Sequence, residues 1–175
     1  TGVDISEDMI SLASGRLGDE VAFVKTDGKT INLPNGSADI VFSATVLQHN
    51  TDLKMLEATL REMCRISGDE LVLFERIEAE RKGNELCLGH PISYYQDICK
   101  KEGFELISKD FINIQVSYLV CGVIARLFDS QERKEGEPMN GFATLLQKAS
   151  LTLTRPLDRI FTAKRDLGKL HFKRK

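Results

Sequence analysis

Short apolar segments alternate with amphipathic segments along most of this chain, and this alternation constrains its fold more than any other feature. Helices are predicted most clearly at residues 51–67 and 92–102, where apolar side chains recur at helical spacing. Strands that alternate with helices pair in parallel, so the pattern predicts an α/β fold with a doubly wound, mostly parallel sheet. The predicted strands are residues 2–5, 21–27, 39–43, 69–75 and 104–111.

The pattern changes after residue 111. Residues 116–128 and 142–161 are predicted to be helices, with a break or kink at Pro156 because proline lacks a backbone N–H. In residues 168–175, Leu170 and Phe172 alternate with polar residues, which is typical of a strand at the edge of a sheet. We therefore expect a single domain over residues 1–175, with a helical insertion at residues 114–164 between the last two strands.

Cysteine usage and the length of the apolar runs indicate a compartment. The four cysteines form no C-x-x-C pair, so we expect reduced thiols, no disulfide framework and no zinc site. The longest apolar run, VSYLVCGVIARLF, is too short to cross a bilayer. These features predict a cytoplasmic protein.

Charge is unevenly distributed, although the chain as a whole is almost neutral. From Arg155 onward there are eight Lys/Arg residues against two Asp residues. Such a basic C-terminal region favours an anionic partner, either a membrane surface contacted peripherally or a phosphate-bearing substrate. A solvated helix face followed by a terminal strand would give the same pattern, and both interpretations stay open.

Two acidic residues stand where predicted strands end. Asp4 ends the first strand in the stretch VDIS, and Asp27 ends the second. The carboxylate of Asp4 can accept hydrogen bonds from both hydroxyls of a ribose, or it can cap the helix that begins after Ser6. Asp27 precedes Gly28, whose missing side chain lets a flat base approach the main chain, but Asp-Gly pairs are also common in ordinary turns.

Four segments, taken in order, resemble the class I S-adenosylmethionine-dependent methyltransferases, specifically the broad small-molecule group called methyltransferase type 11. The segments are VDIS, KTDGKTINLP, ADIVFSATVLQH and LREMCRISGDELVLFE, and the resemblance covers roughly residues 1–108. It implies a Rossmann-like sheet with an antiparallel last strand, S-adenosylmethionine as cofactor and methyl transfer as activity. The implied acceptor is a small molecule, or a glycan or lipid precursor.

The resemblance also assigns cofactor-binding residues. It implies that Asp4 accepts hydrogen bonds from the ribose hydroxyls and that Ile5 packs on the adenine face. Asp27 would accept from the adenine amino group, with the Gly28 backbone alongside. The residues that it places beside the methionine part of the cofactor are Ser43 and Ala44.

Methyl transfer from a sulfonium depends mainly on holding the acceptor in line, and a base matters only when the acceptor loses a proton. His49 is one candidate base, although it could equally fix its loop by hydrogen bonding. His90 and Tyr94 are further candidates, because the region after the fourth strand lines the acceptor pocket in similar proteins. Tyr95 points about 100° away from Tyr94 on a helix, so at most one of the two would face the site.

The chain departs from the family pattern at its start, where the first strand and the glycine-rich loop are absent. We therefore expect an N-terminally truncated fragment that binds the cofactor poorly and does not turn over alone. Two other interpretations remain: a methyltransferase-like interaction domain without catalysis, and an NAD(P)-dependent dehydrogenase, whose ribose Asp4 would also suit. The stretch SATVLQH lacks the Asn-Pro-Pro-aromatic pattern of enzymes that methylate base amino groups, which disfavours nucleic acid as a partner.

Overall fold

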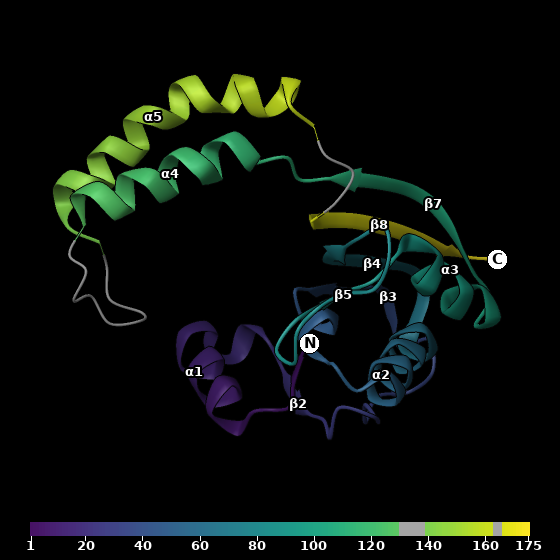
Figure 1. Ribbon diagram of the computed structural model, residues 1–175. Coiled ribbons are helices and arrows are strands. Elements are labelled where there is room, and N and C mark those ends of the chain that lie inside the picture. Colours follow the sequence, from purple (N-terminus) through teal and green to yellow (C-terminus); the bar gives the residue numbers. More distant parts are fainter. Residues whose placement is uncertain (130–138, 163–165) are drawn as a thin grey trace. The chain divides into compact units, whose positions relative to one another are not determined.

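The computed structural model describes residues 1–129, 139–162 and 166–175, and the chain divides into two compact units (Figure 1). The sheet unit comprises Thr1–Phe111 and Lys164–Lys175. The second unit, Ile112–Ala163, contains two helices and is called the helical hairpin here.

Four strands form the main sheet of the sheet unit, in the order β3, β4, β8, β7. β3 and β4 are parallel, whereas β8 is antiparallel to both of its neighbours. The prediction of an α/β fold with an antiparallel last strand is confirmed. The four strands are β3 (Ala38–Ala44), β4 (Ser67–Ile77), β7 (Phe104–Phe111) and β8 (Asp166–Arg174).

The prediction that the last strand lies at the edge of the sheet is wrong. β8 pairs with β4 on one side and with β7 on the other, so β7 is the edge. Leu170 and Phe172 are buried, while His171 on the opposite face bonds to Glu70. Alternating apolar and polar residues indicate that one face of a strand is buried. They do not indicate how many strands pair with it.

The first two strands form a separate parallel pair. β1 (Gly2–Asp4) and β2 (Phe23–Lys25) are joined by α1 (Glu7–Leu17), whose first turn is capped by the Ser6 hydroxyl. Among the described residues, β1 has a ladder with β2 alone and β3 has one with β4 alone. The sheet therefore consists of two separate parts. The apolar side chains of Val3 on β1 and of Ile40 and Phe42 on β3 are exposed.

Two helices supply half of the buried side chains in the core of the sheet unit. α2 (Leu53–Ile66) is capped by Asp52, whose carboxylate accepts from the N–H groups of Lys54 and Met55. α3 (Ile92–Lys101) follows a small ribbon made of β5 (Lys82–Gly83) and β6 (Leu88–Gly89). The buried side chains that these helices direct into the core are Leu56, Leu60, Met63, Cys64, Ile66, Tyr95, Ile98 and Cys99.

The helical hairpin consists of α4 (Gln115–Phe128) and α5 (Gly141–Ile160). α5 continues for four residues past Pro156, so the predicted break does not occur there. Asn140 caps α5 by accepting from the N–H of Ala143 at 2.8 Å. None of the described helices is long and apolar enough to cross a membrane.

Candidate functional site

The end of β1 places Asp4 in a tight turn before α1. Its Oδ1 accepts from the N–H of Ser6 at 2.8 Å, and the Ser6 hydroxyl accepts from the N–H of Met9 at 3.3 Å. These bonds fix the strand-to-helix turn with one carboxylate oxygen. None of the described residues donates to the other oxygen, which leaves Oδ2 able to accept from a ligand.

The turn after β2 brings two of the predicted adenine-binding residues together. Gly28 has φ of 81°, and a Cβ there would lie 3.5 Å from Cδ1 of Ile5 and 3.5 Å from Sδ of Met55. The Thr59 hydroxyl donates to the Gly28 carbonyl, which anchors the turn to α2. Ile5 itself remains more than half exposed. The structure therefore forms a shallow apolar surface beside the Gly28 backbone.

Asp27 takes part in this turn as well. Its Oδ1 accepts from the N–H groups of Lys29 at 2.8 Å and Thr30 at 2.7 Å. These two bonds lower the pKa of Asp27, so its carboxylate is charged at neutral pH. Within the described residues, Oδ2 receives no hydrogen bond. Asp27 thus serves the turn and still offers an oxygen to a ligand.

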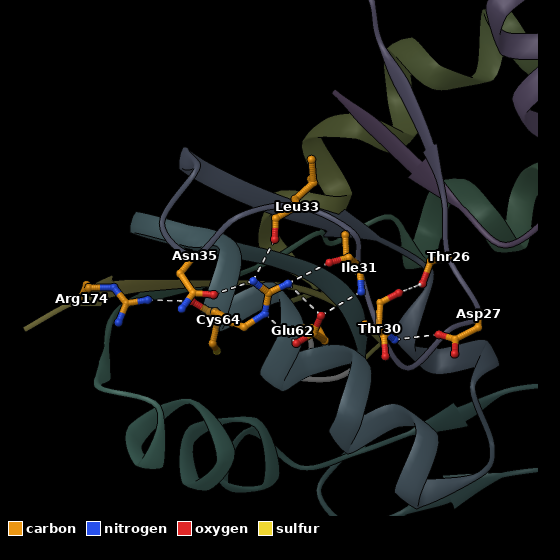
Figure 2. Close-up of polar contacts among 10 residues, drawn as sticks. Thr26, Asp27, Thr30, Ile31, Leu33, Asn35, Glu62, Cys64 and Arg174 are labelled. Atoms are coloured by element: carbon orange, nitrogen blue, oxygen red, sulfur yellow. Dashed lines mark hydrogen bonds and ion pairs between the residues drawn. The ribbon is translucent and has the colours of Figure 1, made fainter.

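The segment between Asp27 and β3 is held by a pair of charged residues on α2 (Figure 2). The Arg65 guanidinium donates to the carbonyls of Ile31 and Leu33, both at 2.8 Å, and to Oδ1 of Asn35 at 2.7 Å. Glu62 pairs with Arg65 and also accepts from the N–H of Ile31 at 2.8 Å. The bonds from Arg65 lower the pKa of Glu62, which keeps the pair ionised.

At the end of β3, a buried carboxylate organises the next loop. Glu75 of β4 is 0% exposed and accepts from the Ser43 hydroxyl at 2.7 Å. It also accepts from the N–H groups of Val46 and Gln48, both at 3.1 Å. These three bonds tie the end of β3 and the loop that follows it, residues 43–48, to β4.

Thr45, in the same loop, has an unusual backbone conformation. Its φ is 55°, although its side chain is β-branched. Such a conformation costs about 1–3 kcal/mol and persists where surrounding contacts enforce it, often at functional sites. Here the Thr45 N–H donates to the Phe74 carbonyl at 2.8 Å, and the bonds of Glu75 hold the residues that follow.

Three residues of the segment LREMCRISGDELVLFE have structural roles that were not predicted: Glu62, Arg65 and Glu75. A signal for Glu75 was present, because it falls in the inward-facing row of β4 together with Leu71, Leu73 and Ile77. A carboxylate in an apolar row must find donors, and the nearest are those of the loop after β3. Glu62 and Arg65 gave no comparable signal, because their partners are backbone atoms of an irregular segment.

His49 bridges two loops. Its Nδ1 lies 2.8 Å from the Leu86 carbonyl, so this nitrogen carries the proton in the neutral ring. Its Nε2 lies 3.2 Å from Nε2 of Gln48 and can accept there. The ring is exposed, so it fixes the loop and can still exchange a proton with a bound molecule.

His90 and Tyr94 lie together in an aromatic cluster. Their rings stack with centroids 4.5 Å apart, and Tyr95 meets the His90 ring edge-on at 6.1 Å. Burial, helped by the charge of Arg81, lowers the pKa of His90, and burial raises the pKa of Tyr94. His90 is therefore neutral, and the phenol of Tyr94 holds its proton tightly.

Two polar atoms of this cluster are buried without a partner among the described residues, Nε2 of His90 and Oη of Tyr95. Tyr95 is 0% exposed and belongs to the core, so of the two tyrosines Tyr94 is the more accessible. No group of His, Cys, Asp and Glu within residues 1–129, 139–162 and 166–175 is arranged to hold a metal ion.

Residues 1–69 match the protein family described as "Methyltransferase domain". This match covers 69 of the 175 residues, so the first part of the chain is similar to this family. The matched stretch contains the Asp4, Asp27 and Ser43 strand ends together with both α2 residues that hold the second loop. No curated protein matches the sequence significantly.

Solved structures extend the likeness to nearly the whole chain. The cyclase SpnF aligns with TM-score 0.60 at 14% identity over 99% of this chain and 64% of that one. Magnesium protoporphyrin IX methyltransferase from Synechocystis PCC 6803 with bound SAM gives TM-score 0.55 at 16% identity, over 99% and 58%. Phosphoethanolamine N-methyltransferase 2 from Haemonchus contortus, complexed with phosphomonomethylethanolamine and S-adenosylhomocysteine, gives TM-score 0.62 at 15% identity, over 99% and 42%.

The chain thus spans less than two thirds of each of these three proteins. At such identities the likeness establishes the fold, and it extends to a protein that is named as a cyclase. The reaction must therefore be inferred from the site itself.

Proposed function

We propose that this domain belongs to an S-adenosylmethionine-dependent methyltransferase that acts on a small molecule or on a glycan or lipid precursor. The observation that carries the proposal is that two carboxylates follow neighbouring parallel strands: Asp4 ends β1, and Asp27 lies two residues past the end of β2. Each carboxylate fixes its own turn with one oxygen and leaves the other oxygen without a donor from the described residues. Ligands of doubly wound sheets bind beyond such strand ends.

Each residue has a distinct task in this proposal. Asp4 accepts from the ribose hydroxyls, while Ile5 and the Gly28 backbone receive the flat base beside Asp27. Charge-assisted hydrogen bonds to a carboxylate contribute about 1.5–3 kcal/mol each, so Asp4 carries the largest share of binding. Ser43 and Ala44 lie beside the methionine part of the cofactor.

The cofactor, when bound, supplies a methyl group on a sulfonium, which is a good leaving group. The chain then has to hold an acceptor in line and exclude water. Glu75 keeps residues 45–48 in place beside the reacting centre. For an acceptor that loses a proton, Nε2 of His49 takes it, because Nδ1 is already committed to the Leu86 carbonyl.

We further propose that a strand and a glycine-rich turn from outside these 175 residues complete the sheet between β1 and β3. The support is the sheet's division into two parts and the exposed apolar side chains Val3, Ile40 and Phe42. A strand buried on both faces would cover such side chains. Backbone N–H groups of a glycine-rich turn would hold the methionine end. The 175-residue chain alone then binds the cofactor weakly and does not turn over.

Calorimetric titration with S-adenosylhomocysteine tests both statements. The 175-residue chain is compared with a form extended by the upstream coding sequence. We expect stoichiometric binding by the extended form only, weakened on the order of 10- to 100-fold by Asp4→Asn. Asp8→Asn, an equal charge change on exposed α1, is the matched control and leaves binding unchanged.

Each other outcome has a definite meaning. Tight binding by the 175-residue chain would refute the proposed incompleteness. An extended form that binds NADH instead is a dehydrogenase, and one that binds neither ligand is an interaction domain.

A further inference from the structure

The helical hairpin joins its two helices through polar groups. The Ser117 hydroxyl donates to Asp158 and lies 2.8 Å from the Thr154 hydroxyl oxygen. Asp158 also accepts from the N–H groups of Val116 at 2.7 Å and Ser117 at 3.3 Å. Farther along, Gln147 donates to the Cys121 carbonyl at 2.9 Å. The buried side chains of both helices are small or polar: Ser117, Ala143, Thr154 and Asp158.

Large apolar side chains lie on the outside of the hairpin instead. On α5 they recur every three to eight residues on one side of the helix, and this row is called the apolar stripe here. Leu153 is 74% exposed and Ile160 is 70% exposed. The stripe consists of Phe142, Leu145, Leu153, Leu157 and Ile160, and α4 adds exposed Leu119, Val123 and Leu127. Contiguous apolar surface of this kind marks an interaction site.

The exposed charges of α5 lie beside this stripe and are all basic. Lys148, Arg155 and Arg159 are seven and four residues apart, which places them along one side of the helix, and all are exposed. The one acidic residue of the two helices, Asp158, is turned into the seam between them. The outer surface of α5 is therefore apolar with a basic border.

Several of the basic residues in the C-terminal region, from Arg155 onward, are engaged by other groups of the sheet unit. Lys173 of β8 pairs with Asp69 at 3.6 Å, and Lys175, just after β8, pairs with Glu105 at 2.6 Å. Arg174 donates to two backbone carbonyls and covers the Phe104 ring. Lys164 and Arg165 lie outside the described residues. Among the described residues, Lys148, Arg155 and Arg159 of α5 and Arg126 of α4 are exposed basic side chains that lie beside exposed apolar ones on the same helix.

We propose that α5 lies in the headgroup region of a bilayer that contains anionic lipid. The apolar stripe enters the boundary of the acyl chains, while Lys148, Arg155 and Arg159 meet the lipid phosphates. Paired stripes of two copies of the chain would bury the same apolar surface. Such a dimer would bring Lys148, Arg155 and Arg159 of both copies, six cations in all, to one interface. Neither helix has an outward-facing acidic residue to pair with them, so their repulsion disfavours the dimer.

Fluorescence gives a direct test because the chain contains no tryptophan. A Leu153→Trp variant reports on the stripe, and a Leu86→Trp variant reports on an exposed loop of the sheet unit. Each is mixed with vesicles of phosphatidylcholine alone or of phosphatidylcholine with phosphatidylglycerol. We expect the emission of the Leu153→Trp variant to shift to shorter wavelength with the anionic vesicles only, and that of the Leu86→Trp variant to stay unchanged.

Charge removal tests the basic border. Lys148→Gln, Arg155→Gln and Arg159→Gln together should weaken vesicle binding about 100-fold, because each cation near an anionic surface contributes about one factor of five. The matched control removes three exposed lysines of the sheet unit, Lys100→Gln, Lys101→Gln and Lys109→Gln, and should bind as the original chain does. Circular dichroism confirms that both variants keep their helices, and binding should weaken as salt rises.

Several results would overturn the proposal. Equal binding to neutral vesicles, or full binding by the triple α5 variant, removes the role of the basic border. An emission shift of the Leu153→Trp variant that occurs without vesicles and follows protein concentration assigns the stripe to a second copy of the chain. No shift under any condition leaves the stripe outside the bilayer. The proposal does not depend on methyl transfer, so cofactor titration and vesicle binding can fail separately.

Discussion

The sheet unit and the helical hairpin distribute the same kinds of side chain in opposite ways. In the sheet unit, leucines such as Leu71 and Leu73 are fully buried between the strands and α2, and most charged groups face outward. In the hairpin, Asp158 and Thr154 are buried, and most of the leucines, such as Leu145 and Leu153, are exposed. The sheet unit is therefore stabilised mainly by apolar burial, whereas the hairpin is held together by hydrogen bonds.

This difference shows that an amphipathic pattern defines two faces and leaves open which of them is inside. The periodicity of α5 is as regular as that of α2, yet α2 turns its apolar side to the core and α5 turns its own outward. The comparison predicts different responses to mutation in the two units.

The largest effect is expected from truncating a leucine in the core of the sheet unit. Leu71→Ala should lower the free energy of unfolding by about 2–5 kcal/mol, because it leaves a cavity beside α2. Leu153→Ala removes the same atoms from the exposed stripe and should change the free energy of unfolding by less than about 0.5 kcal/mol. Urea titration followed by circular dichroism measures both. Equal losses of stability would mean that the stripe is buried within the chain, and would contradict the contrast between the two units.

The next effect concerns the buried carboxylate. Glu75→Gln should cost about 2–3 kcal/mol, since an amide NH2 placed at either oxygen position faces a backbone N–H, that of Val46 or Gln48. Ser43→Ala removes a single donor and should cost about 1 kcal/mol. Both are measured by the same urea titration. A Gln variant as stable as the original would show that Glu75 does not anchor the loop.

A smaller loss is expected where α2 holds the segment after Asp27. Arg65→Lys replaces a planar group with five donors by a point charge that cannot reach Ile31, Leu33 and Asn35 together, and should cost about 1–2 kcal/mol. Arg61→Lys, on an exposed pair with Glu57, should leave the melting temperature unchanged. Similar shifts in both variants would contradict a specific role for Arg65.

The smallest effect is a pH dependence confined to the hairpin. Burial alone raises the pKa of Asp158, but hydrogen bonds from Ser117 and Val116 outweigh it and lower the pKa below its ordinary value. A depressed pKa contributes stability that is present above the unfolded value of about 3.9 and is lost as pH falls through the folded pKa. The amide NMR signals of Val116 and Ser117 should titrate with a midpoint below that value. Asp158→Asn should abolish this titration, and a midpoint above it would contradict the assignment.

Much of the local structure could be predicted from the sequence. The helix expected at residues 51–67 spans Leu53–Ile66, and the strand expected at residues 104–111 is Phe104–Phe111. These elements have long periodic patterns and clear stop signals such as Gly68 and Gly103. Asp4, Ile5, Asp27 and Gly28 were placed at strand ends from the same patterns.

Features that depend on contacts between distant segments could not be predicted in this way. The interior position of β8 is set by ladders with both β4 and β7, and no local pattern encodes the number of neighbours. The partners of Arg65 are carbonyls more than thirty residues earlier. The orientation of α5 depends on the seam between Ser117 and Asp158, where a polar pair replaces the apolar contact that helical spacing suggests.

One continuous segment, residues 60–75, holds both loops on the ligand side: Glu62 and Arg65 fix the loop after Asp27, and Glu75 fixes the loop after Ser43. In a mutational scan, substitutions in this segment should therefore lower activity as strongly as substitutions of ligand-binding residues. The side chains of Glu62, Arg65 and Glu75 act by fixing the positions of the two loops. Kinetics would separate the two cases. In the form extended by the upstream coding sequence, variants of Glu62, Arg65 or Glu75 should lose affinity for cofactor and acceptor together and keep the shape of the pH–rate profile. Loss of a proton-transferring group such as His49 should change that shape.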